Sequence, residues 1–264
     1  MYIKKYIKTQ VYDYPHLETS AYQISEYYGN NRLPGLDLVF ISNGEPMAED
    51  NWQTLLKACP RAKRSDGVTG REAAYKAAAR LSSTPWFYAV FAKTEVLPTF
   101  KFDFVPDYFQ EPKHYIFHSR NALNGLEYGA MNINLYNRKL VLETDPGLDF
   151  TLSKAHTVVP ECISISRFNT DPWITWRSAF RETMKLQREV DLGASLEIQH
   201  RLEVWCTVAE GDNAEYCIQG ALDGVEYYKS VGGDYEALKL SFDWAWCQEY
   251  YYKKYNRKIW LETI

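Results

Sequence analysis

The chain has 264 residues, which is enough for one large domain or a domain with an appendage, so its stability does not require disulfides or structural metals. A net charge of -4 and an isoelectric point of about 5.8 argue against a protein whose whole surface binds nucleic acid, while leaving room for local basic clusters. Five scattered cysteines without a CxxC pair exclude a disulfide framework and a zinc knuckle, and no apolar run approaches the roughly twenty residues of a membrane span.

The first predicted elements form the beginning of an α/β unit. Residues 2–12 predict a strand, and no chemistry is assigned to the tyrosine-rich segment that follows. Residues 37–42, DLVFIS, predict a short buried strand that the turn dipeptide Asn43-Gly44 closes. Residues 50–58 then show helical periodicity, and the order strand, turn, helix is typical of an α/β fold.

A basic cluster follows this helix at Arg61, Lys63 and Arg64, just before Asp66. Two interpretations stay open for it. Such a cluster is commonly a solvated loop, but this one is placed to reach the same sheet edge as Asn43 and could face a ligand there.

The next predicted helix begins with Thr69 and Glu72, which have the spacing of a capping box. We expect it to end near residue 81 and to bury a stripe made of Ala73, Ala74, Ala77, Ala78 and Leu81.

Arg71 falls in the first turn of this helix, where the helix dipole disfavours a cation. A bound anion such as a diphosphate would explain an arginine at this position. The alternative is a solvent-facing arginine paired with Glu72 or Asp66.

The apolar run that begins at Trp86 predicts a fully buried strand, and it stops abruptly at Lys93-Thr94-Glu95. Ligands of open α/β sheets bind beyond the carboxyl ends of the strands. We therefore expect these three side chains to face a ligand.

The rest of the chain changes from strands to helices. Further strands are predicted at 113–118, 135–143 and 158–168, with turns at 124–129 and 145–151. A helix begins at Asp171 and Pro172, with an inward face of Trp173, Trp176, Phe180 and Met184 and with Arg177, Arg181 and Lys185 on another face. Two more helices are expected at 196–209 and 214–231. We predict an α/β domain over 1–186 and a helical appendage over 187–264.

This order of elements is similar to that of the nucleotide-binding half of glycosyltransferases with the GT-A fold, a Rossmann-like, mixed but mostly parallel sheet flanked by helices. Four phrases look like those of phage relatives of the JBP-associated (base J) DNA glucosyltransferase of kinetoplastids: PWFYAVFAKTEV, PKHYIFHSRNALNGLEYG, LDFTL and DPWITWRSAFRE. The resemblance covers about residues 36–186.

The resemblance implies a hexosyltransferase that moves glucose from UDP-glucose to a 5-hydroxymethyl pyrimidine in phage DNA. The alternatives are a transferase acting on a polysaccharide or protein, and a noncatalytic nucleotide-sugar-binding protein. DNA would present a flipped base. Its phosphates would contact Arg61, Lys63 and Arg64, or Arg177, Arg181 and Lys185, although the helix-borne set could equally form an intramolecular salt-bridge face. The setting would be cytoplasmic, in the infected host if the chain is phage-encoded, with no membrane partner.

The resemblance also implies roles for individual residues. GT-A enzymes hold a divalent metal with a D-x-D motif after the buried strand, and here Lys93 stands in place of the first acid while Glu95 matches the second. Either Glu95 and a second carboxylate hold Mn²⁺ or Mg²⁺, or Lys93 replaces the metal by stabilising the leaving diphosphate. The candidate metal ligands are Glu95, Asp103, Asp107 and His156.

The remaining assignments concern the acceptor base and the donor. Asp149 is the first candidate for the residue that deprotonates the acceptor, with Glu127 second, although Asp149 could instead cap the turn at Thr151. The donor site is expected to contain Asn43, Gly44, Glu45, Asp66, Arg71, Lys93 and Glu95.

Overall fold

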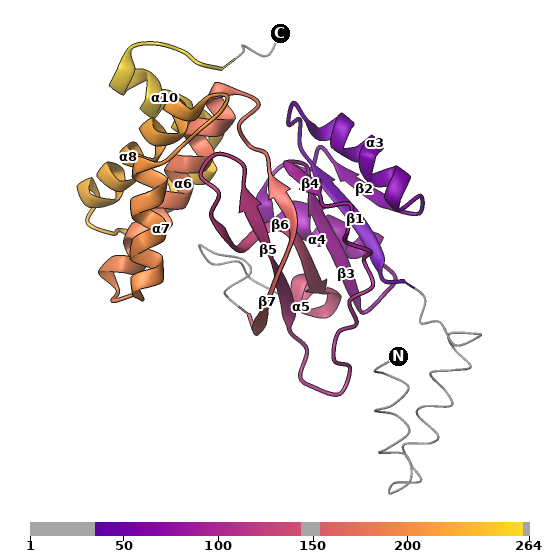
Figure 1. The fold of residues 1–264 in the computed structure, drawn as a ribbon. Helices are drawn as coiled ribbons and strands as arrows, with labels where there is room; N and C mark the ends of the chain where they lie inside the picture. The colour runs from indigo at the N-terminus through magenta and orange to yellow at the C-terminus, as the bar shows by residue number, and fades with distance from the viewer. Residues whose placement is uncertain (1–34, 144–153, 261–264) are drawn as a thin grey trace, which may run out of the picture. The chain divides into compact units, whose positions relative to one another are not determined.

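A computed structural model describes residues 35–143 and 154–260 of the chain (Figure 1). The predicted strand at 2–12 and the turn at 145–151, which includes Asp149, lie outside the described residues. Residues 37–264 form one compact unit, and the description below concerns the described part of that unit.

The described part of this unit contains a seven-stranded sheet in the order β2-β1-β3-β6-β5-β7-β4. Its strands are β1 (Asp37–Ser42), β2 (Lys63–Asp66), β3 (Trp86–Phe91), β4 (Thr94–Val96), β5 (His114–Asn121), β6 (Glu127–Asn137) and β7 (His156–Ser166). β1 is parallel to β2 and β3, and β5 to β7, whereas β6 is antiparallel to both β3 and β5, and β4 to β7. The α/β class and a mixed sheet are confirmed, but the expectation of a mostly parallel sheet is wrong. β6 follows β5 through a short turn and must run back beside it.

Helix α3 (Ala48–Ala58) follows β1, and α4 (Arg71–Leu81) covers one face of the sheet. The buried side of α4 packs on β1, β3 and β6 through a core of Tyr75, Ala78 and Ala79 against Val39, Phe87, Ala89 and Tyr136. The predicted capping box is not formed, because α4 begins after Gly70, whose φ is 92°, without a side-chain cap. The predicted alanine stripe is also displaced.

The alanine stripe of α4 is displaced because Tyr75 is the side chain that packs against the sheet. Tyr75 makes ring contacts with Phe91 and Tyr136 at centroid distances of 5.5 and 5.8 Å. These contacts turn the face of α4 that carries Tyr75 toward the sheet and leave Ala73 and Leu81 exposed.

Two segments adopt a different secondary structure from the one expected. Residues 63–66 form the edge strand β2 rather than a loop, because their backbone continues the parallel ladder of β1. The strand expected at 135–143 ends at Asn137, and Arg138–Glu143 is the helix α5. The Asn137 side chain accepts a hydrogen bond from the Leu140 N–H at 3.1 Å, which stabilises this helix start.

The described chain is largely helical from residue 172 to residue 255, as predicted. The elements are α6 (Pro172–Asp191), α7 (Leu196–Thr207), α8 (Ala214–Ser230), α9 (Tyr235–Lys239), a short 3₁₀ turn (Leu240–Phe242) and α10 (Trp244–Tyr255). Figure 1 shows α6, α7 and α8 beside the β5–β7 side of the sheet, away from α3. The Asp171 cap is confirmed by its bond with the Ile174 N–H at 3.0 Å. The boundary predicted after residue 186 falls within α6 and stays a prediction.

The helical region has a core of its own. The predicted inward face of α6 is buried, and it packs on Tyr227, Tyr228 and Tyr251 of α8 and α10. α6 and α8 approach closely at Gly220 and Gly224, where an added Cβ would lie 2.2 Å from a backbone oxygen of α6. Among the described residues, no helix is long and apolar enough to cross a membrane.

Candidate functional site

A cavity lined by several charged side chains lies between the sheet and α6. It has a volume of about 570 Å³. The sheet side is formed by β5 and β6, with Ile116, Asn132 and Asn134, and the opposite side by α6 and α7. Because Asn134 pairs with Ala89, this is the same face of the sheet that α4 covers.

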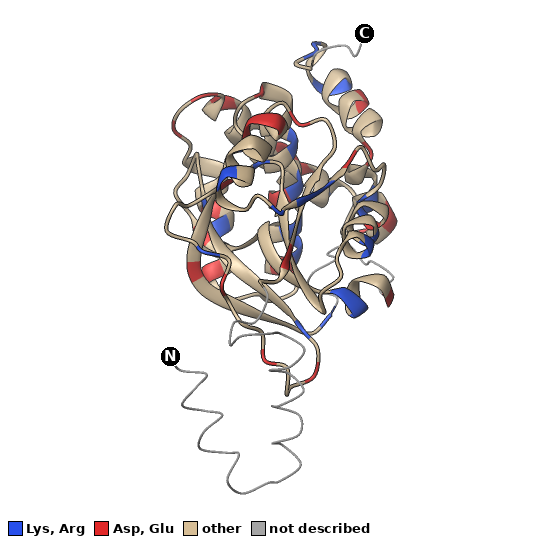
Figure 2. Ribbon diagram, turned by 90° about the vertical axis from the view of Figure 1, so that its right-hand side faces the viewer, with Lys and Arg blue, Asp and Glu red and all other residues tan. Residues whose placement is uncertain are grey.

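The cavity is strongly cationic. The described basic side chains that line it are Lys93, Arg177, Arg181, Lys185, Arg188 and Arg201, and the described acidic ones are Glu182 and Glu189. Four of these cations come from successive turns of α6, at a spacing that places them along one face of the helix. Elsewhere, basic and acidic residues are interspersed over the ribbon, as Figure 2 shows. The charge imbalance is therefore a local property of this cavity, and its sign favours an anionic ligand.

Of the three residues expected to face a ligand after β3, Lys93 alone lines the cavity. Burial lowers the pKa of its ammonium group to about 8. Thr94 is buried in β4, where its hydroxyl donates to the Asn132 backbone oxygen at 3.0 Å. Glu95 forms an ion pair with Arg167 at the sheet edge.

Arg177 and Arg181 are held against aromatic rings at the other side of the cavity. The Arg181 guanidinium lies 4.5 Å from the centre of the Phe242 ring, and Arg71 of α4 lies 4.3 Å from the same ring. Arg177 donates to the Phe242 backbone oxygen at 3.2 Å and lies over Trp244. Burial lowers the pKa of Arg181 to about 9 and also lowers that of Arg177. These charges have lost much of their hydration, which strengthens their attraction for an anion.

Glu182 is the acidic counterpart of these cations. Its Oε2 lies 2.9 Å from Lys185 Nζ, and its Oε1 accepts a hydrogen bond from the Tyr128 hydroxyl at 3.1 Å. Burial would raise the pKa of Glu182, but Lys185, together with Lys93 and the Tyr128 hydroxyl, holds it below its usual value. The carboxylate is therefore ionised at neutral pH.

Four other expected donor-site residues, Asn43, Gly44, Glu45 and Asp66, lie at the carboxyl ends of β1 and β2, outside the cavity lining. The Asn43 N–H donates to the Glu45 carboxylate at 2.6 Å, and Gly44 between them has a φ of 80°. Asp66 accepts hydrogen bonds from Ser42 and Arg64. The Glu45 charge acts on the pKa of Lys93, so this cluster and the cavity are neighbours.

The four expected metal ligands do not come together. Glu95 pairs with Ile165 near one end of β7, whereas His156 begins β7, nine residues away, or roughly 30 Å at about 3.3 Å per residue. The Asp107 N–H donates to the Tyr115 hydroxyl at 3.0 Å, near the His156 end.

Asp103 is exposed on the loop that covers the other face of the sheet. In the part of the chain that the structure describes, no group of three or more His, Cys, Asp or Glu residues could hold a metal ion. The donor set expected from the sequence therefore does not fit a single metal ion.

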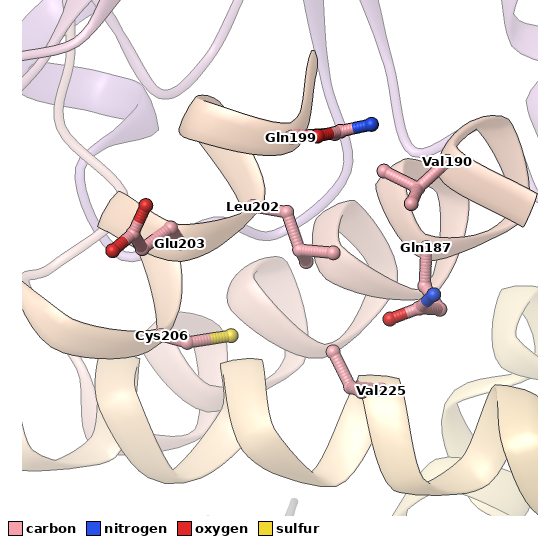
Figure 3. Close-up of a pocket in the computed structure, with 7 residues that line it drawn as sticks. All are labelled: Gln187, Val190, Gln199, Leu202, Glu203, Cys206 and Val225. Atoms are coloured by element: carbon pink, nitrogen blue, oxygen red, sulfur yellow. The ribbon is translucent and has the colours of Figure 1, made fainter. Parts of the chain in front are cut away.

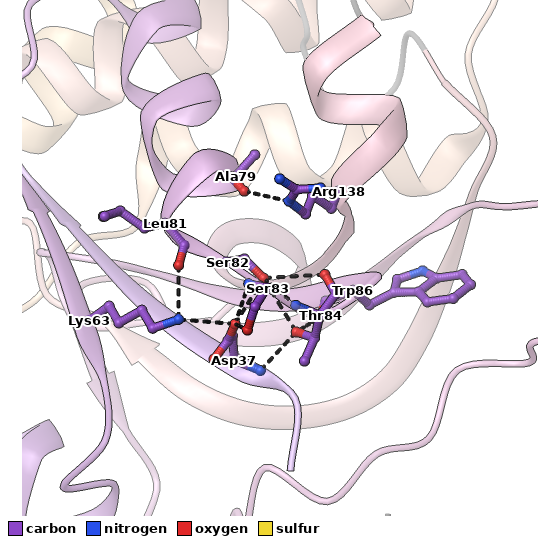
Figure 4. Close-up of polar contacts among 9 residues, drawn as sticks. All are labelled: Asp37, Lys63, Ala79, Leu81, Ser82, Ser83, Thr84, Trp86 and Arg138. Carbon is purple, nitrogen blue, oxygen red and sulfur yellow. Dashed lines mark hydrogen bonds and ion pairs between the residues drawn. The ribbon is translucent and has the colours of Figure 1, made fainter. Parts of the chain in front are cut away.

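Most of the expected DNA contacts are engaged within the fold. Lys63 lies between Asp37, at 3.1 Å, and the Leu81 backbone oxygen, at 2.8 Å, as the close-up in Figure 4 shows. Arg64 forms ion pairs with Glu49 and Asp66 at 2.7 and 3.3 Å.

Arg61 is exposed ahead of β2, while Arg177 and Arg181 line the cavity instead of an outer surface. Glu127, the second candidate for the acceptor base, forms an ion pair with Arg120 at 2.6 Å. Asp149 lies outside the described residues.

Sequence reasoning did not identify Tyr128, Glu182 or Arg201 as site residues, and it considered Lys185 only as a possible DNA phosphate contact. The helical spacing of the charged residues on α6 could have identified Glu182 and Lys185 as members of the same charged helix face. No local signal marks Tyr128, because its importance depends on the packing of α6 and α7 beside β6.

A second cavity, of about 450 Å³, lies among α6, α7 and α8. Figure 3 shows the side chains around it: Gln187, Val190, Gln199, Leu202, Glu203, Cys206 and Val225. Glu203 is the sole charged side chain among these lining residues. This second cavity therefore lacks the cluster of charged side chains that lines the first.

No protein-family model matches the sequence, and no curated protein matches it. Three chains of known structure do match. One is described as a glycosyltransferase involved in the glycosylation of the major capsid of PBCV-1. The match has 10% sequence identity and a TM-score of 0.33, and it covers 49% of this chain and 94% of that chain.

Proposed function

We propose that the chain is a glycosyltransferase that takes glucose from UDP-glucose and passes it to the hydroxyl of a 5-hydroxymethyl pyrimidine in phage DNA. The observation that carries the proposal is the cationic cavity beyond the carboxyl end of β3, with Lys93 on one side and the basic face of α6 on the other. This is the place in an open α/β sheet where ligands bind.

The dimensions and chemistry of the cavity suit a sugar nucleotide. A volume of about 570 Å³ falls in the range of small-molecule sites. Lys93, Arg181 and Lys185 would bind the diphosphate, which carries the negative charge of the donor. Asn132, Asn134 and Ser119 offer amide and hydroxyl groups of the kind that hydrogen-bond sugar hydroxyls.

The arrangement favours Lys93 over a metal as the group that stabilises the leaving diphosphate. Departure of the sugar leaves additional charge on the diphosphate, and fixed cations in a partly dehydrated cavity stabilise that charge. Glu95, the residue that matches the second acid of the D-x-D motif, forms an ion pair with Arg167. We therefore expect transfer to proceed in EDTA.

The DNA acceptor rests on the resemblance of four sequence phrases to those of phage relatives of the base J glucosyltransferase. A target base flipped out of the duplex could carry its hydroxymethyl group into the cavity. Arg188 and Arg201, which line the cavity from α6 and α7, are candidates for phosphate contacts.

The test is incubation with labelled UDP-glucose and either hydroxymethylated or unmodified DNA of the same sequence. We expect label in the hydroxymethylated DNA alone, with and without EDTA. Label in a polysaccharide or protein acceptor would replace the DNA assignment.

The engagement of Glu95 with Arg167 is the observation that favours a noncatalytic donor-binding protein. Binding of UDP-glucose with neither transfer nor slow donor hydrolysis would support that alternative and contradict the proposed activity.

A further inference from the structure

Glu182 is an acidic side chain in a cavity wall that otherwise attracts anions. Its side chain is 24% exposed and lines the cavity. The charges of Lys185 and Lys93 act on it, and Arg201 lies over the ring of its partner Tyr128. A carboxylate at the centre of such a site weakens the binding of a diphosphate by repulsion. Its presence there calls for another role.

The partners of Glu182 fix its orientation. The indole N–H of Trp205 donates to the Tyr128 hydroxyl at 3.2 Å, so that hydroxyl has its own proton to donate to Glu182. Arg201 lies over the Tyr128 ring at 4.4 Å and holds it in place. Lys185 forms an ion pair with the second carboxylate oxygen of Glu182.

Each oxygen of Glu182 therefore has one protein donor, and an ionised carboxylate oxygen can accept a second. The side chain is therefore held as an acceptor that still has room for further hydrogen bonds. The hydroxyl group of an incoming acceptor molecule is a donor of the right kind.

We propose that Glu182 accepts the proton of the acceptor hydroxyl during sugar transfer, a role that rests on the proposed function. The acceptor oxygen forms a bond with the anomeric carbon while the bond from that carbon to the diphosphate oxygen breaks. The electron pair of the broken bond leaves with the diphosphate, and the hydroxyl proton goes to Glu182 and then to water. This single displacement predicts inversion at the anomeric carbon.

The proposal gives α6 both chemical tasks of the reaction. Lys185 and Arg181 would receive the leaving diphosphate, and Glu182 between them would activate the acceptor. The helical region is then part of the active site and not an accessory to it. Asp149, the base suggested by the resemblance, becomes the competing assignment.

The experiment compares Glu182→Gln, Asp149→Asn and, as a control, Glu249→Gln in the full chain. Glu182→Gln keeps the shape of the side chain but cannot accept the proton, so kcat should fall at least 100-fold. UDP-glucose binding, measured by calorimetry, should be unchanged or tighter because a negative charge has been removed. Glu249→Gln changes an exposed carboxylate on α10 that is paired with Lys253 and does not line the cavity, so it should leave kcat within about threefold of the original.

A Glu182→Asp variant separates a chemical role from a structural one. It should be at least tenfold more active than Glu182→Gln, because it keeps a proton acceptor although it changes the packing more. The decline of kcat/KM at acidic pH should be present in Glu182→Asp and absent from Glu182→Gln. Near-normal turnover of Glu182→Gln, or a Glu182→Asp variant no more active than it, would overturn the assignment. If the unmodified chain fails to bind UDP-glucose, the proposed function itself fails.

Discussion

Replacing Lys93 with methionine should stabilise the protein and weaken donor binding. Burial lowers the pKa of Lys93 from 10.5 to about 8. At about 1.4 kcal/mol for each pH unit, the buried charge destabilises the native state by up to about 3 kcal/mol. Methionine has a similar length and no charge, so this cost disappears in the variant.

The number of protons bound to Lys93 in the native and unfolded states determines how the free energy of unfolding changes with pH. Between about pH 8 and 10.5 the unfolded chain holds a proton on Lys93 that the native protein has lost. Native stability therefore rises with pH through this window, and the cost of the charge is present in full only below about pH 8. The advantage of Lys93→Met should be largest at pH 7 and should shrink toward pH 10.5.

Urea unfolding at pH 7 and pH 10 measures this effect, with Lys57→Met as the control because Lys57 is exposed on α3. We expect Lys93→Met to raise the free energy of unfolding at pH 7 by about 2 to 3 kcal/mol and Lys57→Met to change it by less than about 0.5 kcal/mol. Calorimetry should show at least tenfold weaker UDP-glucose binding for Lys93→Met. A Lys93→Met variant that is less stable than the original at pH 7 would refute the reasoning.

Three further predictions concern pH and packing. The dissociation constant for UDP-glucose should rise above about pH 8, by up to tenfold per pH unit, as Lys93 loses its proton, whereas a Lys93→Arg variant should show a flat profile in calorimetry. Gly220→Ala should lower the free energy of unfolding by several kcal/mol in a urea titration, because the new Cβ would lie 2.2 Å from the Trp176 backbone oxygen. Asp223→Asn should lower it by roughly 3 kcal/mol, because this buried carboxylate accepts from the Trp176 indole at 2.7 Å and forms an ion pair with Lys254 at 2.8 Å.

Matched variants on α8 serve as controls for the packing predictions. Leu222→Ala changes an exposed side chain two residues from Gly220 and should cost less than about 1 kcal/mol. Glu226 also forms an ion pair with Lys254, but it is exposed, so Glu226→Gln should cost much less than Asp223→Asn. If Gly220→Ala and Leu222→Ala, or Asp223→Asn and Glu226→Gln, lowered the free energy of unfolding equally, the packing described for α6 and α8 would be contradicted.

Local sequence signals predicted those elements whose ends are set by neighbouring residues. Asp171 caps α6 as expected, since its partner Ile174 is three residues away. β2 was missed because the sequence KRSD has no apolar residue, and it becomes a strand through pairing with β1. The change from strand to helix at Asn137 was missed because residues 135–143 are apolar enough for either structure.

The candidate site was predicted only in part for a similar reason. Lys93 was found because its place after a buried strand is visible in the sequence. Tyr128 and Glu182 were not found as partners, since they are 54 residues apart and meet only through the packing of α6 beside β6. The candidate metal ligands do not come together, because β7 separates Glu95 from His156 by most of its length, and this separation depends on strand pairing.

The central claim is that the cavity between the sheet and α6 binds a sugar nucleotide through fixed cations. Calorimetric titration of UDP-glucose in the presence of EDTA tests it most directly, with glucose as the uncharged control and Arg181→Gln as the matched variant. We expect saturable binding of UDP-glucose by the original chain, at least tenfold weaker binding by Arg181→Gln and none of glucose. Absence of binding, or binding that appears only when Mn²⁺ replaces EDTA, would contradict the account.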